Sequence, residues 1–165
     1  LPPGFRLLPQ CDGDFGVRLM TATSDLLQTH AGAMMVNADS PTLPASILSA
    51  AVSATRRGNA VVLSPALDGG YTLIGVSDTH PRLYEEIPWS TSTVFEKTVE
   101  RASEIGLPVV TVPGWYDVDD AASLAILQSE LDGAPPFADA GAHAPATRAH
   151  LAARQAAPLR AGSAR

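Results

Sequence analysis

Apolar and polar residues alternate along the chain in blocks, and the spacing within each block predicts its secondary structure. Short apolar runs, typical of buried strands, occupy residues 33–38, 60–65, 71–76 and 107–112. Apolar residues at helical spacing predict helices over residues 21–30, 43–57, 92–105 and 121–131. Residues 1–20 mix proline, glycine and short apolar runs, which predicts irregular structure around a short strand. Because strands and helices alternate, we predict an α/β domain with a largely parallel sheet.

Residues with the properties of helix termini stand at the ends of two predicted helices. Pro44 falls in the first turn of the helix over residues 43–57, and Gly58 follows its last residue. Thr93 and Glu96 have the spacing of a capping box at the start of the helix over residues 92–105. These signals predict where both helices begin and where the first one ends.

The pattern of strands and helices stops after Asp132. Residues 133–165 are rich in alanine, proline and arginine and contain few large apolar side chains. Such a segment buries too little apolar surface to offset the loss of chain entropy on folding. We therefore predict a domain over residues 1–132, followed by a disordered or loosely helical tail outside the core.

The net charge of −6 is unevenly distributed along the chain. The tail over residues 133–165 holds four arginines against Asp139, a charge of +3, which leaves −9 for the domain. An acidic domain argues against a nucleic-acid partner, because phosphate contacts need clustered lysine and arginine. It is compatible with carboxylates gathered around a divalent metal ion.

Two further features bear on the location of the protein. No apolar run approaches the ~20 residues that a membrane-spanning helix needs. Cys11 is the single cysteine, so an intrachain disulfide is impossible. We therefore expect a cytoplasmic protein without a membrane span.

Asp39 directly follows the predicted strand over residues 33–38. Ligands of open α/β sheets gather at the carboxyl ends of the strands. A carboxylate in this position can hold Mg²⁺ or Mn²⁺ while diphosphate oxygens complete the coordination shell. The alternative is a structural aspartate that accepts backbone N–H bonds in the turn or caps the next helix.

A second acidic cluster, Asp117, Asp119 and Asp120, lies before the last predicted helix. Residues two apart in an extended segment point the same way, so Asp117 and Asp119 can share one site. The alternative is that these residues cap the helix and complement its positive end. Spacing alone does not show whether this cluster meets Asp39.

Three other segments carry candidate binding residues. Asp68, Gly69 and Gly70 separate two predicted strands, and they form either a ligand-approached loop or a simple hairpin turn. Arg18, in the polar segment 10–18, suits a phosphate or carboxylate, or a surface ion pair. Trp89 is followed by two hydroxyl residues, Ser90 and Thr91, and its indole forms either a pocket wall or part of the core.

Taken in order, these segments resemble a bacterial family of GT-A-like proteins labelled as glycosyltransferases, including relatives named for arsenosugar biosynthesis. The matching pieces, which span residues 5–131, are Gln10…Gly13-Asp14-x-Gly16-x-Arg18, Asp39-Ser40-Pro41-x-Leu43-Pro44, Asp68-Gly69-Gly70-Tyr71-x-Leu73-Ile74-Gly75, Ile87-Pro88-Trp89-Ser90-Thr91 and Asp117-Val118-Asp119. Each piece alone is a weak pattern, whereas five in the family's order are specific.

The resemblance implies a three-layer α/β/α fold of the nucleotide-diphospho-sugar transferase (GT-A) type. It also implies Asp39 as the metal-binding acid after a central strand, with Asp119 and Asp117 as the second acidic element. The segment from Asp68 to Tyr71, together with Trp89, would line the acceptor side. The candidate substrate-binding residues are then Gln10, Asp14, Arg18, Gly69, Gly70, Tyr71, Trp89, Ser90 and Thr91.

The chain departs from the family pattern in two places. Family members begin with further strands and a basic loop that grips the nucleotide, so we expect this chain to lack its first strands. A sheet without those strands exposes an apolar edge, which predicts self-association into a homo-oligomer. Before Asp39 the chain has Ala38 where the family usually has glycine.

Three functions fit these features. The first is metal-dependent transfer of a sugar from a nucleotide-diphosphate sugar to a small-molecule acceptor, with Asp68 orienting or deprotonating the acceptor hydroxyl. The second is nucleotidyl transfer from an NTP to a phosphorylated acceptor, which releases pyrophosphate. The third is a non-catalytic remnant used for interaction, because Lys97 is the single lysine and the phosphate-gripping loop is absent.

Overall fold

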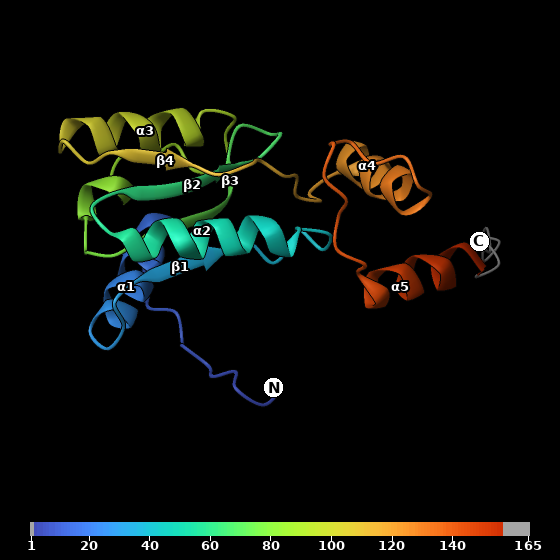
Figure 1. The fold of residues 1–165 in the computed structure, drawn as a ribbon, viewed down its shortest axis with the longest axis horizontal. Coiled ribbons are helices and arrows are strands. Elements are labelled where there is room, and N and C mark those ends of the chain that lie inside the picture. The colour runs from blue at the N-terminus through green and yellow to red at the C-terminus, as the bar shows by residue number, and fades with distance from the viewer. Residues whose placement is uncertain (1, 157–165) are drawn as a thin grey trace, which may run out of the picture.

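A computed structural model describes residues 2–156 of the chain. The described part forms four strands, five α-helices and one 3₁₀ helix (Figure 1). In chain order they are α1 (Phe15–Leu27), β1 (Ala33–Val36), α2 (Ala45–Arg57), β2 (Val61–Pro65), β3 (Tyr71–Val76), η1 (Pro81–Tyr84), α3 (Val94–Glu104), β4 (Val109–Thr111), α4 (Ala121–Leu131) and α5 (Pro145–Ala156). None of the helices within residues 2–156 is long and apolar enough to cross a membrane.

The strands form one mixed sheet in the order β1-β3-β2-β4. β3 runs antiparallel to both β1 and β2, whereas β2 and β4 are parallel. The prediction of a largely parallel sheet is therefore wrong for β3. The cause is local, because the short link between β2 and β3 closes a hairpin through the bond from Ala66 N to Gly70 O at 3.0 Å, and short links join antiparallel strands.

Strand direction has a consequence for the site. β1, β2 and β4 all run antiparallel to β3 or parallel to one another, so their carboxyl ends lie at the same edge of the sheet. The outer edge of β1 pairs with no other strand within residues 2–156. The self-association inferred for such an edge stays a prediction.

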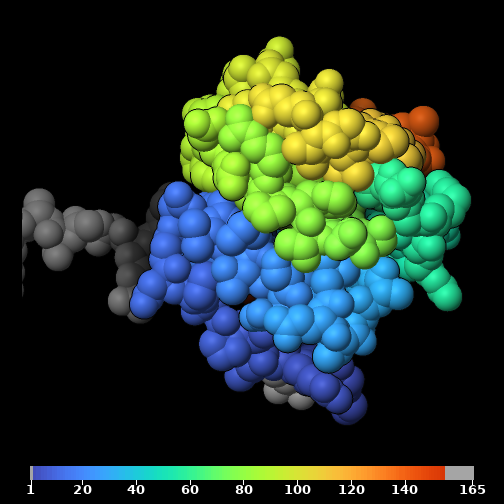
Figure 2. Space-filling view, turned by 90° about the vertical axis from the view of Figure 1, so that its left-hand side faces the viewer, coloured from blue at the N-terminus to red at the C-terminus, as the bar shows by residue number. Residues whose placement is uncertain are grey.

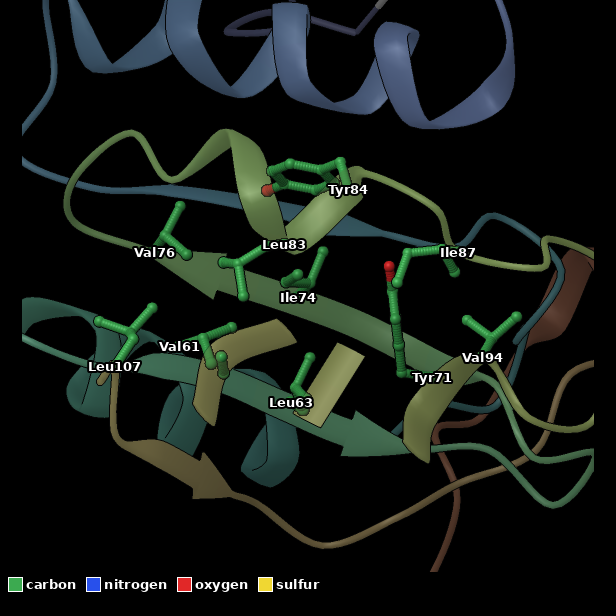
Figure 3. Packing of buried hydrophobic residues seen from close by; sticks show 11 residues of the cluster. Val61, Leu63, Tyr71, Ile74, Val76, Leu83, Tyr84, Ile87, Val94 and Leu107 are labelled. Atoms are coloured by element: carbon green, nitrogen blue, oxygen red, sulfur yellow. The ribbon is translucent and has the colours of Figure 1, made fainter. Parts of the chain in front are cut away.

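Helices cover both faces of the sheet, as three layers. One face carries Val61, Leu63 and Ile74, which pack with side chains of η1 and α3 (Figure 3) and with partly buried side chains of α1. The other face carries Val62 and Leu73, which pack with side chains of α2 and α4. The alternation follows from the period of two along a strand, and both faces are apolar because both are covered.

Helix α1 begins much earlier than the predicted helix over residues 21–30. Asp14 caps it by accepting the N–H of Val17 at 2.9 Å. The glycines in this segment favour a loop on propensity alone. Gly16 is nevertheless buried in the helix, and Tyr84 packs so closely that an added Cβ would lie 2.5 Å from its carbonyl oxygen. Close packing against η1 therefore outweighs helix propensity here.

The N-terminus of α3 lacks a capping box, whereas that of α4 has one. The capping box predicted for Thr93 and Glu96 is absent, since the Thr93 side chain makes no capping hydrogen bond. At α4, Asp120 and Ser123 do form a capping box, in which the Asp120 carboxylate accepts the N–H of Ser123 at 2.8 Å. Asp120 thus serves the helix, as the alternative interpretation of that cluster proposed.

Part of the segment predicted to be a tail is folded against the domain. The Phe137 ring lies 5.0 Å from that of Trp115, and Leu151 of α5 packs against the core cluster that contains Trp115. Alanine-rich sequence has high helix propensity, which explains α5. The prediction of a tail outside the core is therefore wrong for these residues, and residues 157–165 lie outside the described part. The domain boundary at residue 132 stays a prediction.

Candidate metal centre

Three carboxylates converge at the carboxyl edge of the sheet. Asp68, Asp117 and Asp119 each place one oxygen within 4.8 Å of the other two. Asp68 and Asp119 are exposed, whereas Asp117 is 9% exposed. The three acids line one pocket, together with Leu67, Tyr116, Asp120, Ser123 and Ile126.

Long-range strand pairing brings these acids together. Past the end of β4, Trp115 N donates to Pro65 O at 3.0 Å, and an isolated parallel bridge joins Ala66 to Trp115. This contact continues the pairing of β2 with β4 beyond both strands. Asp68 follows Ala66 by two residues and Asp117 follows Trp115 by two residues, so the two paired segments bring both acids to the same edge of the sheet.

The turn that carries Asp68 is rigidly held. The Asp68 carboxylate accepts the N–H of Gly70 at 2.8 Å. Gly69 has a φ of +93°, and an added Cβ would overlap the backbone of Ser92. The carbonyl of Gly69 accepts the N–H of Phe95 at 2.9 Å. Gly69 and Gly70, predicted to bind substrate, therefore shape the turn and dock it against the start of α3.

Asp39 lies beside this group without belonging to it. The sequence predicts Asp39, Asp117 and Asp119 as metal ligands, whereas the structure groups Asp117 and Asp119 with Asp68. The Asp39 carbonyl accepts the N–H of Val118 at 3.0 Å, which fastens its loop to the segment between the two acids. Its carboxylate is exposed, and its charge contributes to the raised pKa values of Asp117 and Asp119.

Burial and mutual repulsion disfavour the ionised acids. Burial, followed by the charge of Asp68, raises the pKa of Asp117 from 3.8 to about 6. Burial and the charges of Asp39 and Asp68 raise the pKa of Asp119 as well. A bound divalent cation would lower the pKa values of Asp117 and Asp119, because its charge attracts the ionised carboxylates and offsets their mutual repulsion.

The donor set fits Mg²⁺ or Mn²⁺. Both are hard ions that prefer oxygen ligands, and carboxylates supply these with the needed negative charge. An ion about 2.1 Å from each ligand joins oxygens up to about 4.2 Å apart. The ligand oxygens of Asp68, Asp117 and Asp119 all lie within 4.8 Å of one another, which is close to this limit.

The capping box of α4 fixes Asp119 from the other side. The Ser123 hydroxyl accepts the backbone N–H groups of both Asp119 and Asp120 at 3.0 Å. The bonds from Ser123 to the Asp120 carboxylate lower the pKa of Asp120, so this acid is satisfied by the helix. Asp119 is therefore held at the entrance of the helix while its own carboxylate stays available.

A second group of predicted residues meets beside α1, where Figure 2 shows α1 against the segment that follows β3. Arg18 donates to the side chain of Gln10 at 3.1 Å and makes no ion pair within residues 2–156. The ring of Phe15 packs edge-on against Trp89, with 5.0 Å between ring centroids. Asp14 and Trp89 line one groove together with residues of η1.

The remaining predicted residues lie in a turn and in the core. Thr91 donates to the carbonyl of Pro88 at 2.7 Å, and exposed Ser90 adopts a φ of +62°, so both shape the turn before α3. Tyr71 is 7% exposed and packs in the core cluster of Figure 3. Tyr71 thus packs in the core, and its role in substrate binding stays a prediction.

Sequence reasoning missed Asp68 as a member of the acidic group. The parallel pairing of β2 with β4 is the signal that places it there, since residues after two paired parallel strands meet at one edge. A pattern of short apolar runs does not specify which strands pair. The same limit hid the contacts of Thr42, Tyr116 and Glu130 that are described below.

One solved structure shares most of this fold. It is described as a "putative nucleotide-diphospho-sugar transferase" from Desulfovibrio desulfuricans G20, and it has a TM-score of 0.70 and 26% sequence identity. The similarity covers 88% of this chain but 64% of the Desulfovibrio chain, so this chain spans less than two thirds of its length. No curated protein matches the chain.

The first half of the chain also matches a family model. The model is described as "Uncharacterized protein conserved in bacteria (DUF2064)" and matches residues 1–91. That range contains the Gln10–Arg18, Asp39 and Asp68 segments, whereas Asp117 and Asp119 follow it. Because the match covers more than half of the 165 residues, the chain belongs to the DUF2064 family of bacterial proteins.

Proposed function

We propose that this protein takes part in metal-dependent transfer of a sugar from a nucleotide-diphosphate sugar to an acceptor hydroxyl. The observation that carries the proposal is the group of Asp68, Asp117 and Asp119 at the carboxyl edge of the sheet. Ligands of α/β proteins bind at this edge. The similarity to the Desulfovibrio structure supports a sugar-transferase-like, GT-A type of fold.

In this proposal the acids hold Mg²⁺ or Mn²⁺, with Asp39 beside them. A bound divalent ion supplies electrostatic stabilisation of the departing nucleoside diphosphate. The chain contributes the geometry, because strand pairing fixes Asp117 and the α4 cap fixes Asp119. The groove beside α1, which Asp14 and Trp89 line, is the proposed place for the organic parts of the substrates, and we propose that the Arg18–Gln10 pair also contacts them.

Asp68 has two possible roles that one variant separates. It can be a metal ligand, or it can orient and deprotonate the acceptor hydroxyl as the sequence predicts. Asp68→Asn removes the charge and keeps the shape and the acceptor of the turn bond to Gly70. Loss of Mn²⁺ binding in this variant supports the ligand role. Retained Mn²⁺ binding with loss of sugar transfer supports the acceptor role.

Ligand-dependent unfolding tests the proposal directly. The chain is heated with Mn²⁺, and then with Mn²⁺ plus each nucleotide sugar or NTP. A ligand that binds only the folded chain at about 100 times its dissociation constant adds about 2.7 kcal/mol of stability. A metal-dependent shift with one nucleotide sugar supports sugar transfer and identifies the donor. The absence of any Mn²⁺ shift contradicts the metal site.

Nucleotidyl transfer is the second candidate, and the acidic group is its supporting observation too. The two reactions differ in the leaving group that the bound metal would stabilise. Sugar transfer releases a nucleoside diphosphate, whereas nucleotidyl transfer from an NTP releases pyrophosphate. A stability shift with NTPs alone, followed by detection of pyrophosphate, favours this second reaction.

A further inference from the structure

A buried carboxylate lies behind the acidic group. Glu130 of α4 is 8% exposed and faces the equally buried hydroxyls of Thr42 and Tyr116. Thr42 Oγ1 donates to Glu130 Oε2 at 2.7 Å, and the Tyr116 hydroxyl donates to the same oxygen. The indole N–H of Trp115 donates to Thr42 Oγ1 at 3.2 Å. We call these four residues the Glu130 network.

Proton counting shows why the network needs a carboxylate. The hydroxyls of Thr42 and Tyr116 each have one proton, and both protons go to Glu130. Thr42 then keeps lone pairs for the indole N–H. Burial, followed by the bond to Glu130, raises the pKa of Tyr116, which keeps its hydroxyl protonated as a donor. No cation within residues 2–156 pairs with Glu130.

The network joins the two loops that carry acids. Tyr116 directly precedes Asp117, and Thr42 lies three residues after Asp39. The bond from Val118 N to Asp39 O at 3.0 Å ties the same two loops closer to the metal side. Glu130, which belongs to α4, therefore holds the Asp39 loop through Thr42 and the Asp117 loop through Tyr116.

The segment after α4 closes over the network. Ala142 N donates to Thr42 O at 2.8 Å, and a Cβ on Gly141 would overlap Glu130 Oε1. Arg148 of α5 holds the end of this segment and of α4 by donating to the carbonyls of His143 and Leu131, each at 2.9 Å. Glu130 is thereby buried to 8% exposure, and hydrogen bonds to a charged group are stronger where less water reaches it.

We propose that Glu130 is a positioning residue for the candidate metal centre, acting through Thr42 and Tyr116 on the loops of Asp39 and Asp117. The inference rests on the proposed function for its consequence, which is metal affinity. The way in which Glu130 acts, by holding the loops of Asp39 and Asp117 at a fixed separation, follows from the hydrogen bonds alone. Residues that orient metal ligands from behind contribute about 10–100-fold to metal affinity.

Two chemically identical substitutions test the inference. Thr42→Val removes the bonds to Glu130 and Trp115 and keeps the side-chain shape. Thr23→Val is the matched control, because Thr23 is also buried and bonds Tyr84 at 3.3 Å on the opposite face of the sheet.

A second pair of variants tests Glu130 itself. Glu130→Gln keeps an oxygen acceptor, whereas Glu130→Leu removes it. For each folded variant, Mn²⁺ affinity is measured by electron paramagnetic resonance, and amide exchange of Val118 is measured without metal.

The expected result is a loss of Mn²⁺ affinity by about tenfold or more in Thr42→Val, with Thr23→Val within about twofold of the wild type. Val118 exchange should accelerate in Thr42→Val beyond the change explained by its global stability. Glu130→Gln should retain more affinity than Glu130→Leu. Equal Mn²⁺ affinity in the two threonine variants overturns the inference.

The metal-free readout separates this inference from the proposed function. If the wild-type chain binds no Mn²⁺, the proposed metal site fails and Val118 exchange decides the inference alone. Faster exchange in Thr42→Val than in Thr23→Val then supports the positioning role. Equal exchange in the two variants overturns it.

Discussion

Replacing Asp117 by asparagine is expected to stabilise the metal-free protein and to abolish its response to metal. Burial and the charge of Asp68 raise the pKa of this carboxyl from 3.8 to about 6. A difference of this size corresponds to roughly 3 kcal/mol of disfavour for the ionised form. Because Asp117 opens on a pocket that water reaches, we expect Asp117→Asn to gain about 1–2 kcal/mol at pH 7.5.

The pH dependence of this gain has a definite sign. The folded state takes up the Asp117 proton near pH 6, whereas the unfolded state does so near the ordinary value of 3.8. Wild-type stability therefore rises relative to the variant as the pH falls through this window. The advantage of the asparagine variant should be largest above pH 6 and should vanish near pH 4.

The assay is urea unfolding in EDTA and in Mn²⁺, at several pH values. Asp25→Asn is the matched control, because Asp25 is an exposed residue of α1 that is distant from Asp117 in the sequence. Its replacement should change stability by less than about 0.5 kcal/mol. Mn²⁺ should stabilise the wild type and the control but not Asp117→Asn. Destabilisation of Asp117→Asn in EDTA at pH 7.5, or an undiminished Mn²⁺ response, would refute the reasoning.

Three further substitutions test the packing around the centre, each by urea unfolding. Gly69→Ala should cost more than about 2 kcal/mol, because its backbone has a positive φ and the new methyl overlaps neighbouring backbone, and Gly70→Ala should cost clearly less; similar costs would contradict the docked turn. Asp120→Ala should lower the urea midpoint at neutral pH through the lost cap, and the difference should shrink in acid as the wild-type carboxyl, whose pKa is lowered, takes up its proton. Phe137→Ala should cost about 2 kcal/mol through lost aromatic contact, and an unchanged midpoint would mean that the segment after α4 does not pack.

Some local features of the fold follow from the sequence alone, although the capping box predicted at Thr93 does not form. The ranges predicted for α4 and for the strand at Tyr71–Val76 agree with the structure, and the cap at Asp120 agrees with the alternative interpretation of that acidic cluster. These features depend on residues close in the chain, through periodicity of two or 3.6 and through side-chain bonds to nearby N–H groups.

Features that depend on distant contacts do not follow from the sequence. Gly16 lies in a helix where the carbonyl of Tyr84, distant in the chain, leaves room for nothing larger. β3 reverses direction in the middle of the sheet, which the apolar pattern of a buried strand does not encode. Asp68 joins Asp117 through the bridge at Trp115, across 49 residues of chain, as the difference of their numbers gives.

The two tryptophans of the chain lie in the two regions to which the proposed function assigns the metal and the substrates. Trp115 is 1% exposed and belongs to the Glu130 network, whereas Trp89 is half-buried beside Phe15 in the groove at α1. Each indole therefore reports on its own surroundings by intrinsic fluorescence. Trp115 should emit at shorter wavelength and resist iodide quenching, while Trp89 should be quenched. A chain with one of them replaced by phenylalanine would give a label-free optical probe of either the metal side or the groove.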